Sequence, residues 1–232
     1  MKIAIIGYGA MGKIIERLAK EAAHEVAVVV DQESAGDSPE ELAGKLRGVD
    51  AAIDFSVADA VTRNVEACCV AGVPLVEGTT GWNGELEKIR SIVEESNCAL
   101  VYGANFSIGV NLFYRMVRRA SELMSRFREY EAFIEERHHS RKVDAPSGTA
   151  LKLKQIIEEN IDAGFSVSST RAGNIPGTHT VGFDGPFDQI SLEHTARSRE
   201  GFASGALSAA EWAIGKSGFW EFPEVIDEII GD

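Results

Sequence analysis

A glycine-rich turn near the amino terminus constrains the fold of this chain more than any other feature. Ile3–Ile6 is a short apolar run typical of a buried strand, and Met11–Ala22 carries apolar residues at helical spacing. Between them stands Gly7-Tyr8-Gly9-Ala10-Met11-Gly12. In such a turn the first glycine permits a tight bend, the second lets the backbone approach a pyrophosphate, and the third lets the helix pack against the strand. The pattern predicts a dinucleotide-binding site.

An acidic residue supports this interpretation. Asp31 follows the second strand-like run, Val26–Val30, and lies about 20 positions beyond the turn. A carboxylate there can accept hydrogen bonds from a ribose 2′-hydroxyl, and it would repel a 2′-phosphate. Asp31 therefore favours NADH over NADPH, although a nearby lysine could offset the repulsion, so both remain candidate cofactors. The alternative is a glycine turn in another α/β fold, such as a methyltransferase.

The first hundred residues alternate between short apolar runs and longer helical patterns. Further strand-like runs stand at 51–53, 74–76 and 99–101, and helical patterns stand at 57–71 and 83–95. Strands separated by helices form βαβ units, which place helices on both faces of a parallel sheet. Residues 1–108 are therefore expected to form an α/β domain with a Rossmann-type, doubly wound parallel sheet.

The pattern changes after Ser107. Helical patterns cover 110–127, 151–161 and 202–214, and alternating apolar and polar residues cover 130–136, 178–183 and 189–195. The last two alternating runs flank Asp184-Gly185-Pro186, a turn signal, so they predict a hairpin. Residues 109–199 are expected to form a smaller α+β domain with a mainly antiparallel or mixed sheet.

Two loops follow predicted strands of the first domain. Gly78, Thr79 and Thr80 follow one strand, and Ala104, Asn105 and Phe106 follow another. Both loops should lie at the carboxyl edge of the sheet, where open α/β folds bind ligands. Taken alone, each loop is equally compatible with an ordinary glycine-containing connection.

A basic segment interrupts an acidic chain. Lys and Arg number 23 against 36 Asp and Glu, which gives a formal net charge of −13. This balance excludes a general nucleic-acid binder and disfavours docking on an anionic membrane. Between Arg137 and Lys142, however, only Ser140 is neither basic nor histidine. The local reversal of sign predicts an anionic ligand, and a solvated basic turn is the alternative.

The residues around this segment suit acid–base chemistry on a carboxylate. His138 or His139 can exchange a proton near neutral pH, and Lys142 can supply a proton or hold a carboxylate. Ser147 can cap a helix that begins near Gly148 and Thr149, whose free N–H groups would bind a carboxylate. The paired histidines lack an HExxH pattern or a cysteine partner, so no metal is expected.

The remaining composition indicates a cytoplasmic protein. Cys68, Cys69 and Cys98 form neither a disulfide framework nor a zinc pattern. The longest apolar stretch, Ala67–Val76, is too short for a membrane span, and the amino-terminal apolar run is too short for a signal peptide.

The segment His138-His139-x-x-Lys142-x-Asp144-Ala145-Pro146-Ser147-Gly148-Thr149-Ala150 resembles a signature of the 4-hydroxy-tetrahydrodipicolinate reductase family, also called dihydrodipicolinate reductase. The Gly-Thr-Thr-Gly loop, Ala104–Ser107 and Ser198–Ala206 extend the resemblance over nearly the whole chain. The resemblance implies NADH- or NADPH-dependent reduction of 4-hydroxy-tetrahydrodipicolinate, via dihydrodipicolinate, in diaminopimelate and lysine biosynthesis. The compact glycine turn departs from many members, which have one more residue there, so cofactor preference stays open.

The resemblance also implies roles for individual residues. His138 matches a proton donor or acceptor, Lys142 a proton donor, and His139, Gly148 and Thr149 substrate contacts. The 78–80 and 104–107 loops match the surroundings of the nicotinamide, and Thr80 is expected to contact the substrate as well. Residues 200–232 are expected to return to the first domain, and the chain is expected to form a homotetramer. A related dehydrogenase for another small amino or imino dicarboxylate, or a non-catalytic NAD(P)H sensor, are the alternatives.

Overall fold

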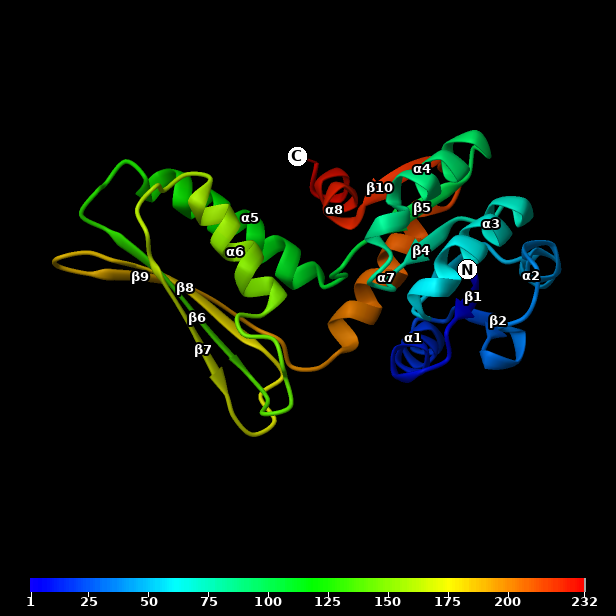
Figure 1. Cartoon of the computed structure of the whole chain (residues 1–232), viewed down its shortest axis with the longest axis horizontal. Coiled ribbons are helices and arrows are strands. Elements are labelled where there is room, and N and C mark those ends of the chain that lie inside the picture. Colours follow the sequence, from blue (N-terminus) through cyan, green and yellow to red (C-terminus); the bar gives the residue numbers. More distant parts are fainter. Residues whose placement is uncertain (232) are drawn as a thin grey trace. The chain divides into compact units, whose positions relative to one another are not determined.

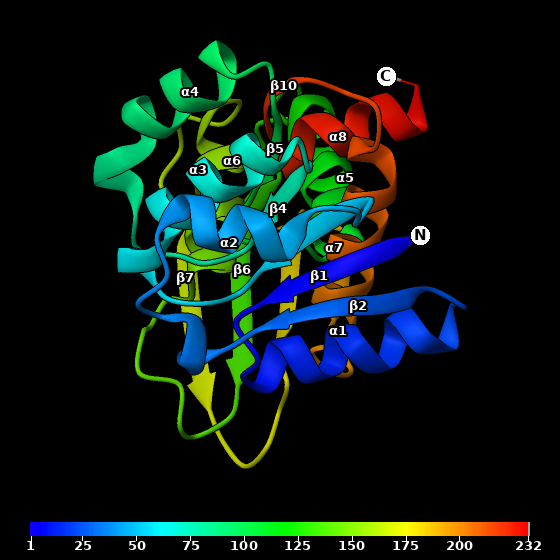
Figure 2. The same cartoon turned by 90° about the vertical axis from the view of Figure 1, so that its right-hand side faces the viewer.

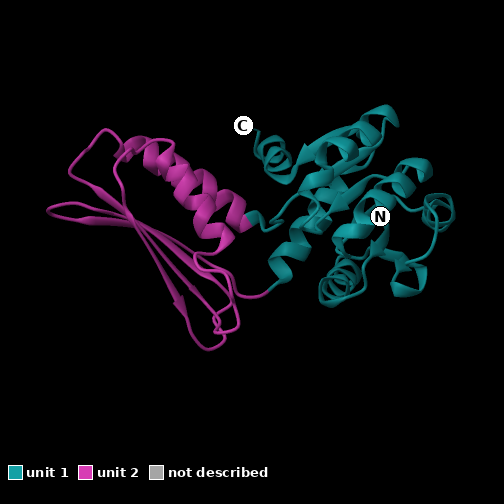
Figure 3. Cartoon of the chain, viewed as in Figure 1, with its two compact units in different colours: residues 1–108, 199–232 teal, residues 109–198 magenta. Residues whose placement is uncertain are grey.

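The computed structural model describes residues 1–231, which fold into two compact units (Figure 3). Unit 1 comprises Met1–Ile108 and the segment from Arg199 onward, and unit 2 comprises Gly109–Ser198. The chain therefore leaves unit 1 once, builds unit 2, and returns to complete unit 1. The expected boundaries at 108 and 199 lie close to these positions.

Unit 1 contains a sheet in which all neighbouring strands are parallel (Figure 1). Its strands are β1 (Lys2–Ile6), β2 (Glu25–Val30), β3 (Ala51–Asp54), β4 (Leu75–Glu77), β5 (Ala99–Tyr102) and β10 (Gly218–Glu221). Their spatial order is β10-β5-β4-β3-β1-β2, so the direction of winding reverses between β1 and β3. Open α/β sheets bind ligands outside the carboxyl ends of the strands at such a reversal.

Helices cover both faces of this sheet, as a doubly wound fold requires (Figure 2). The helices are α1 (Ala10–Glu21), α2 (Pro39–Leu46), α3 (Val61–Ala71), α4 (Leu86–Glu95), α7 (Glu200–Ala213) and α8 (Phe222–Ile230). Short 3₁₀ turns, η1 (Gln32–Ser34), η2 (Ala58–Ala60) and η3 (Asn83–Glu85), precede some of them. Residues of α2, α3 and α4 share one buried core with alternate sheet residues such as Ala4, Ala52 and Leu100. The predicted fold class of this part is confirmed.

Unit 2 is a mixed sheet with two helices on one face (Figure 1). Its strands are β6 (Glu131–His138), β7 (Ser166–Arg171), β8 (Thr178–Asp184) and β9 (Gln189–Thr195), in the order β7-β6-β8-β9. β6 is parallel to β7 and antiparallel to β8, and β8 and β9 form the predicted hairpin. The helices α5 (Ile108–Met124) and α6 (Gly148–Glu158) pack Phe113, Val117 and Leu153 onto the sheet.

Several boundaries differ from the sequence pattern for identifiable reasons. β6 continues to His138 instead of ending at Glu136, because β8 pairs with it as far as Arg137 and β7 as far as His138. α6 begins at Gly148 instead of Leu151, because the Ser147 side chain accepts a hydrogen bond from the Ala150 N–H. The pattern did not predict α2, β7, β10 or α8. Among residues 1–231, no helix is both long and apolar enough to cross a membrane.

Candidate active site

The glycine turn of unit 1 has the conformation that its sequence predicts. Gly7 has φ +85°, and a Cβ there would lie 2.4 Å from the Phe55 carbonyl oxygen. A Cβ on Gly12 would lie 2.3 Å from the Gly7 carbonyl oxygen, so both positions require glycine. Apart from its two chain neighbours, no described residue has an atom within 4 Å of a Cβ built on Gly9, so protein packing leaves that position open. Together with the free N–H groups at the start of α1, from Ala10 and Met11, the turn suits a pyrophosphate.

Asp31 directly follows β2, the position expected for an acidic residue that binds the ribose of a dinucleotide. Its side chain is exposed, and its Oδ1 accepts a hydrogen bond from the Glu33 N–H at 3.0 Å. The second carboxylate oxygen can accept a bond from a ribose hydroxyl. Tyr8, also expected at the cofactor, donates its phenolic hydrogen to the Glu16 carboxylate in α1.

The loop after β4 is held by several backbone contacts. The Thr79 N–H donates to Glu77 Oε1 at 2.7 Å, and the Thr79 carbonyl accepts from the Trp82 indole at 2.7 Å. Thr80 is exposed, whereas Gly78 is half-buried against the Phe55 ring. The loop therefore offers the Thr80 side chain to a ligand, while its neighbours fix the backbone.

The loop after β5 also combines an exposed residue with buried ones. Ala104 is exposed, and the Asn105 side chain accepts a hydrogen bond from the Ser107 N–H at 2.9 Å. Phe106, which was expected at the cofactor, is 1% exposed, and its ring centroid lies 4.7 Å from that of Phe222. The Phe106 side chain is thus part of the unit 1 core, and any ligand contact there involves its backbone.

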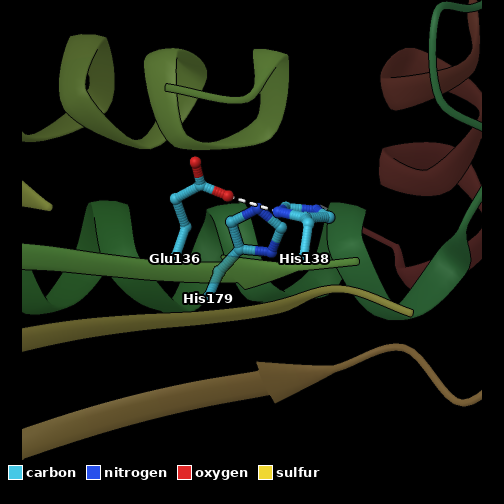
Figure 4. A group of neighbouring side chains, drawn as sticks. All are labelled: Glu136, His138 and His179. Carbon is cyan, nitrogen blue, oxygen red and sulfur yellow. Dashed lines mark hydrogen bonds and ion pairs between the residues drawn. The ribbon is translucent and has the colours of Figure 1, made fainter. Parts of the chain in front are cut away.

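In unit 2 the paired strands bring three polar side chains together (Figure 4). Glu136 and His138 share one face of β6, because residues two apart on a strand point the same way. The antiparallel register places His179 of β8 directly opposite Glu136. All three side chains are buried, and the Glu136 carboxylate accepts a hydrogen bond from His138 Nδ1. We call these residues the histidine cluster.

Arg171 and Ser147 complete the surroundings of the cluster. Arg171, the last residue of β7, donates from Nη2 to Glu136 Oε1 at 2.6 Å, and the Ser147 N–H donates to the same oxygen at 3.2 Å. Ser147 Oγ also shares a hydrogen bond of 3.0 Å with His179 Nε2. Ser147 was expected at the carboxylate-binding start of this helix; its hydroxyl is occupied within the protein and fixes the start of α6.

The cluster combines one charged group with neutral rings. Burial alone would raise the pKa of Glu136, but hydrogen bonds from Arg171, Ser169 and His138 lower it to about 2. Burial lowers the pKa of His138, and the Glu136 carboxylate opposes that shift. Burial and the nearby His138 lower the pKa of His179 to about 4. At neutral pH the cluster thus holds an ionised glutamate beside uncharged imidazoles.

The basic segment does not act as a single patch. Arg137 points to the opposite face of β6 and pairs with Glu193 at 3.1 Å. Arg141 donates to the Asn174 side chain at 2.9 Å. Lys142 lies in the turn after β6, half-buried, with its Nζ 2.8 Å from Asp144 Oδ1. Lys142 and Arg171 therefore supply the positive charge beside the cluster, and Arg137 does not.

The start of α6 and the residue after β6 provide further ligand groups. Gly148 is exposed, and apart from its chain neighbours and the backbone of α6 no described atom lies within 4 Å of a Cβ built on it, so its backbone is open to approach. Thr149 follows in the first turn of α6 and is half-buried. His139 Nδ1 is buried and has no hydrogen-bond partner among residues 1–231. Such a group is suited to a ligand contact, because an unpartnered buried polar atom is costly.

The sequence pattern does not single out Glu136, Arg171 or His179, which the structure places beside His138 and Ser147. Strand alternation could have found Glu136, since it stands two residues before His138. His179 lies in a predicted alternating run, but only the register of β8 against β6 shows which residue it faces. Arg171 ends β7, which the pattern did not predict.

The cluster has the composition of a metal site but a different bonding pattern. One ligand atom from each of Glu136, His138 and His179 lies within 4.8 Å of the others. The Glu136 oxygens, however, already accept hydrogen bonds from Arg171, Ser147 and His138. The nearby guanidinium would also repel a cation. The arrangement is that of a hydrogen-bonded chain that orients His138.

Comparison with known proteins extends over both units. Family models described as "Dihydrodipicolinate reductase, N-terminus" and "Dihydrodipicolinate reductase, C-terminus" match residues 1–106 and 109–226. A 4-hydroxy-tetrahydrodipicolinate reductase from Christiangramia forsetii is 36% identical, with 99% of both chains covered. One from Archaeoglobus fulgidus is 35% identical over 98% of this chain and 100% of the relative.

Solved structures agree with this result at the level of the fold. A dipicolinate-bound dihydrodipicolinate reductase from Paenisporosarcina sp. TG-14 superposes with a TM-score of 0.81, at 21% identity, over 97% of this chain and 99% of that one. A scyllo-inositol dehydrogenase from Lactobacillus casei has a TM-score of 0.53 at 11% identity, covering 99% of this chain and 88% of that one. The two family models and the full-length relatives settle the classification: this chain belongs to the dihydrodipicolinate reductase family.

Proposed function

We propose that this chain reduces 4-hydroxy-tetrahydrodipicolinate, by way of dihydrodipicolinate, to tetrahydrodipicolinate with NADH or NADPH. The product would serve diaminopimelate and lysine biosynthesis. One observation carries the proposal: His138 and Ser147 of the family signature hydrogen-bond to Glu136 and His179, which places a buried histidine cluster beside the capped start of α6. This arrangement combines acid–base groups with a carboxylate-binding helix end.

The glycine turn and Asp31 would hold the cofactor in unit 1. The open surroundings of Gly9 and the N–H groups of Ala10 and Met11 suit the pyrophosphate, and the exposed Asp31 suits a ribose. The loops containing Gly78–Thr80 and Ala104–Phe106 would surround the nicotinamide, which supplies a hydride when bound. The chain's contribution there is to orient the cofactor and to exclude water.

Residues of unit 2 would hold the substrate and complete the reaction. The substrate carries two carboxylates, which suit Lys142, His139 and the N–H groups at Gly148 and Thr149. Thr80 of unit 1 would be an additional substrate contact. After the hydride has added to C4 of the conjugated imine, the resulting enamine-like anion takes up one proton. We assign that proton to the Lys142 ammonium, and His138 acts as a second acid or as an orienting group.

The same resemblance leads us to propose a homotetramer in the cytoplasm. Within unit 2, α5 and α6 cover only one face of the sheet, and on β9 most residues are exposed, including Ile190 at 41%. An open sheet face is a ready surface for self-association. Light scattering on the purified chain would test this, with four chains of 25.0 kDa as the expected mass.

A coupled assay tests the proposed reaction. Dihydrodipicolinate synthase supplies the unstable substrate, and oxidation of NADH or NADPH is followed together with formation of tetrahydrodipicolinate. We expect cofactor oxidation that requires the synthase and gives that product. Oxidation with another amino or imino dicarboxylate alone would favour a related dehydrogenase. Cofactor binding without turnover on any substrate would favour a sensor.

A further inference from the structure

Two carboxyl groups are buried side by side in unit 1, outside the groups that the proposed reaction uses. Asp54 ends β3 and Glu77 ends β4, and the two residues are direct partners across this parallel pair. Both are 0% exposed. An ionised carboxylate is rarely buried without a cation, and two adjacent ones repel each other strongly.

The groups that bind this pair among the described residues are neutral. Asp54 Oδ1 accepts from the Ser56 N–H at 2.8 Å, and its Oδ2 accepts from the Asn64 side chain at 2.6 Å. Glu77 Oε1 accepts from the Thr79 N–H at 2.7 Å. Glu77 Oε2 is buried and receives no donor from residues 1–231.

A single proton on one of the two carboxyl groups would remove the repulsion between them. Asp54 and Glu77 are direct partners across β3 and β4 and are both fully buried, so two ionised carboxylates there would repel each other, whereas one proton lets one carboxyl group donate to the other. Both Asp54 oxygens already accept donors, whereas Glu77 Oε2 has none, so the proton belongs on Glu77 Oε2. Burial raises the pKa of both groups, and the Asp54 charge raises that of Glu77 further.

The neighbouring titratable groups do not replace this proton. Arg63 of α3 donates to the Asn64 amide oxygen and so touches Asp54 only through Asn64. Cys68, also on α3, is buried, and burial raises the pKa of its thiol. Tyr102 stands beside Glu77 in β5, but its hydroxyl donates to Glu221.

The pair ties together the backbone segments at the carboxyl edge of the sheet. The Ser56 N–H, which binds Asp54, also donates to Thr79 Oγ1 at 3.0 Å. The Phe55 carbonyl fills the place of a Cβ on Gly7, and the Phe55 ring lies 2.3 Å from where a Cβ on Gly78 would be. Shifts in this pair would therefore move both the glycine turn and the loop after β4.

We propose that Asp54 and Glu77 share one proton and act as a positioning pair for the cofactor-binding loops of unit 1. Asp54 accepts, and Glu77 donates as a neutral acid. Neither touches the cofactor. The inference rests on the proposed cofactor site, and it specifies that the loops keep their binding geometry only while this proton is retained.

The two positions respond differently to amide substitution. In Glu77→Gln the amide nitrogen replaces the acid O–H, and the amide oxygen still accepts from Thr79, so NADH affinity should stay within about twofold of wild type. In Asp54→Asn an N–H group faces existing donors, so the NADH dissociation constant should rise about tenfold. Glu95→Gln and Asp162→Asn, at exposed positions, are matched controls. Equal effects at both buried positions, or none, would overturn the assignment.

Thermal unfolding over pH tests the proton itself, even if Asp54→Asn does not fold. Glu77 has a raised pKa in the folded chain, so its contribution to stability is complete below its unfolded pKa and declines as the pH rises toward the folded value. The Tm of Glu77→Gln should gain on wild type by about 3 °C or more between about pH 5 and about pH 8. Glu95→Gln should show no such trend. A constant difference would overturn the shared proton, whereas wild-type chain that binds neither NADH nor NADPH would overturn the proposed function instead.

Discussion

Each of the two units buries a glutamate at or near the end of a strand. The two glutamates differ in the direction in which their surroundings shift the pKa. Glu136 of unit 2 is 1% exposed, but Arg171 lies 2.6 Å from it, and its pKa falls to about 2. Glu77 of unit 1 is 0% exposed and has neutral partners and Asp54, and its pKa is raised. Burial alone therefore does not set the charge; the partner does.

This difference matches the chemistry that each unit is proposed to perform. In unit 2 the ionised Glu136 accepts a hydrogen bond from His138 and so fixes the orientation of the imidazole that is proposed to act in the reaction. In unit 1 the proposed shared proton joins two loops and leaves the Asp54–Glu77 pair with one negative charge instead of two. The pH dependence of stability should also have opposite signs: the Glu136 contribution is lost as the pH falls from about 4.5 toward 2, and the Glu77 contribution is lost as the pH rises above about 4.5.

Removing the proposed proton donor should have the largest effect. We expect Lys142→Ala to lower turnover in the coupled assay by more than about 100-fold, the usual scale for loss of a general acid. Lys152→Ala, at an exposed position of α6, is the matched control. Near-normal turnover of Lys142→Ala would remove this residue from the mechanism.

Neutralising Glu136, the buried carboxylate of unit 2, should have the second-largest effect. Glu136→Gln removes the charge that raises the pKa of His138, so turnover should fall about 10-fold to 100-fold. The limb of the pH–rate profile that reports His138 should move to lower pH. Glu135→Gln, on the exposed face of the same strand, should leave the profile in place. An unchanged profile in Glu136→Gln would show that this carboxylate does not act through His138.

A smaller effect is expected at the cofactor ribose. Asp31→Asn can still accept from the Glu33 N–H, so it preserves the local turn while removing the charge. NADH affinity should fall about tenfold or less, whereas NADPH affinity should fall less or improve. Fluorescence titration with each cofactor measures this. Equal weakening for both cofactors would argue against a contact with the ribose.

The smallest effect concerns the start of α6. Ser147→Ala removes the acceptor of the Ala150 N–H and the partner of His179. Loss of a helix cap costs about 1 kcal/mol, so calorimetry should record a Tm lower by about 2–4 °C. Ser140→Ala, an exposed serine of the same unit, is the control. A Tm equal to that of the control would show that the cap contributes nothing.

Local signals were sufficient for much of the fold. The glycine turn, the alternation of strands and helices, and the hairpin turn at 184–186 predicted most elements of both units. β10 could not be predicted, because a four-residue edge strand has too little periodicity. α2, in contrast, carries a readable signal in the capping box of Ser38 and Glu41.

The site was only partly readable, because its contacts join distant strands. His138, Lys142 and Ser147 lie in one signature and could be named from it. The opposition of His179 to Glu136 depends on strand register, and the Asp54–Glu77 pair depends on which strands are neighbours. No local pattern contains that information.

The central claim is that unit 1 binds the cofactor and unit 2 supplies the proton. The most direct test is the NADH dissociation constant of Lys142→Ala, measured by fluorescence on the same preparation used for turnover. If unit 1 holds the cofactor and Lys142 of unit 2 supplies the proton, that constant should stay within about twofold of wild type while turnover falls more than about 100-fold. A dissociation constant that rises in proportion to the loss of turnover would contradict the account.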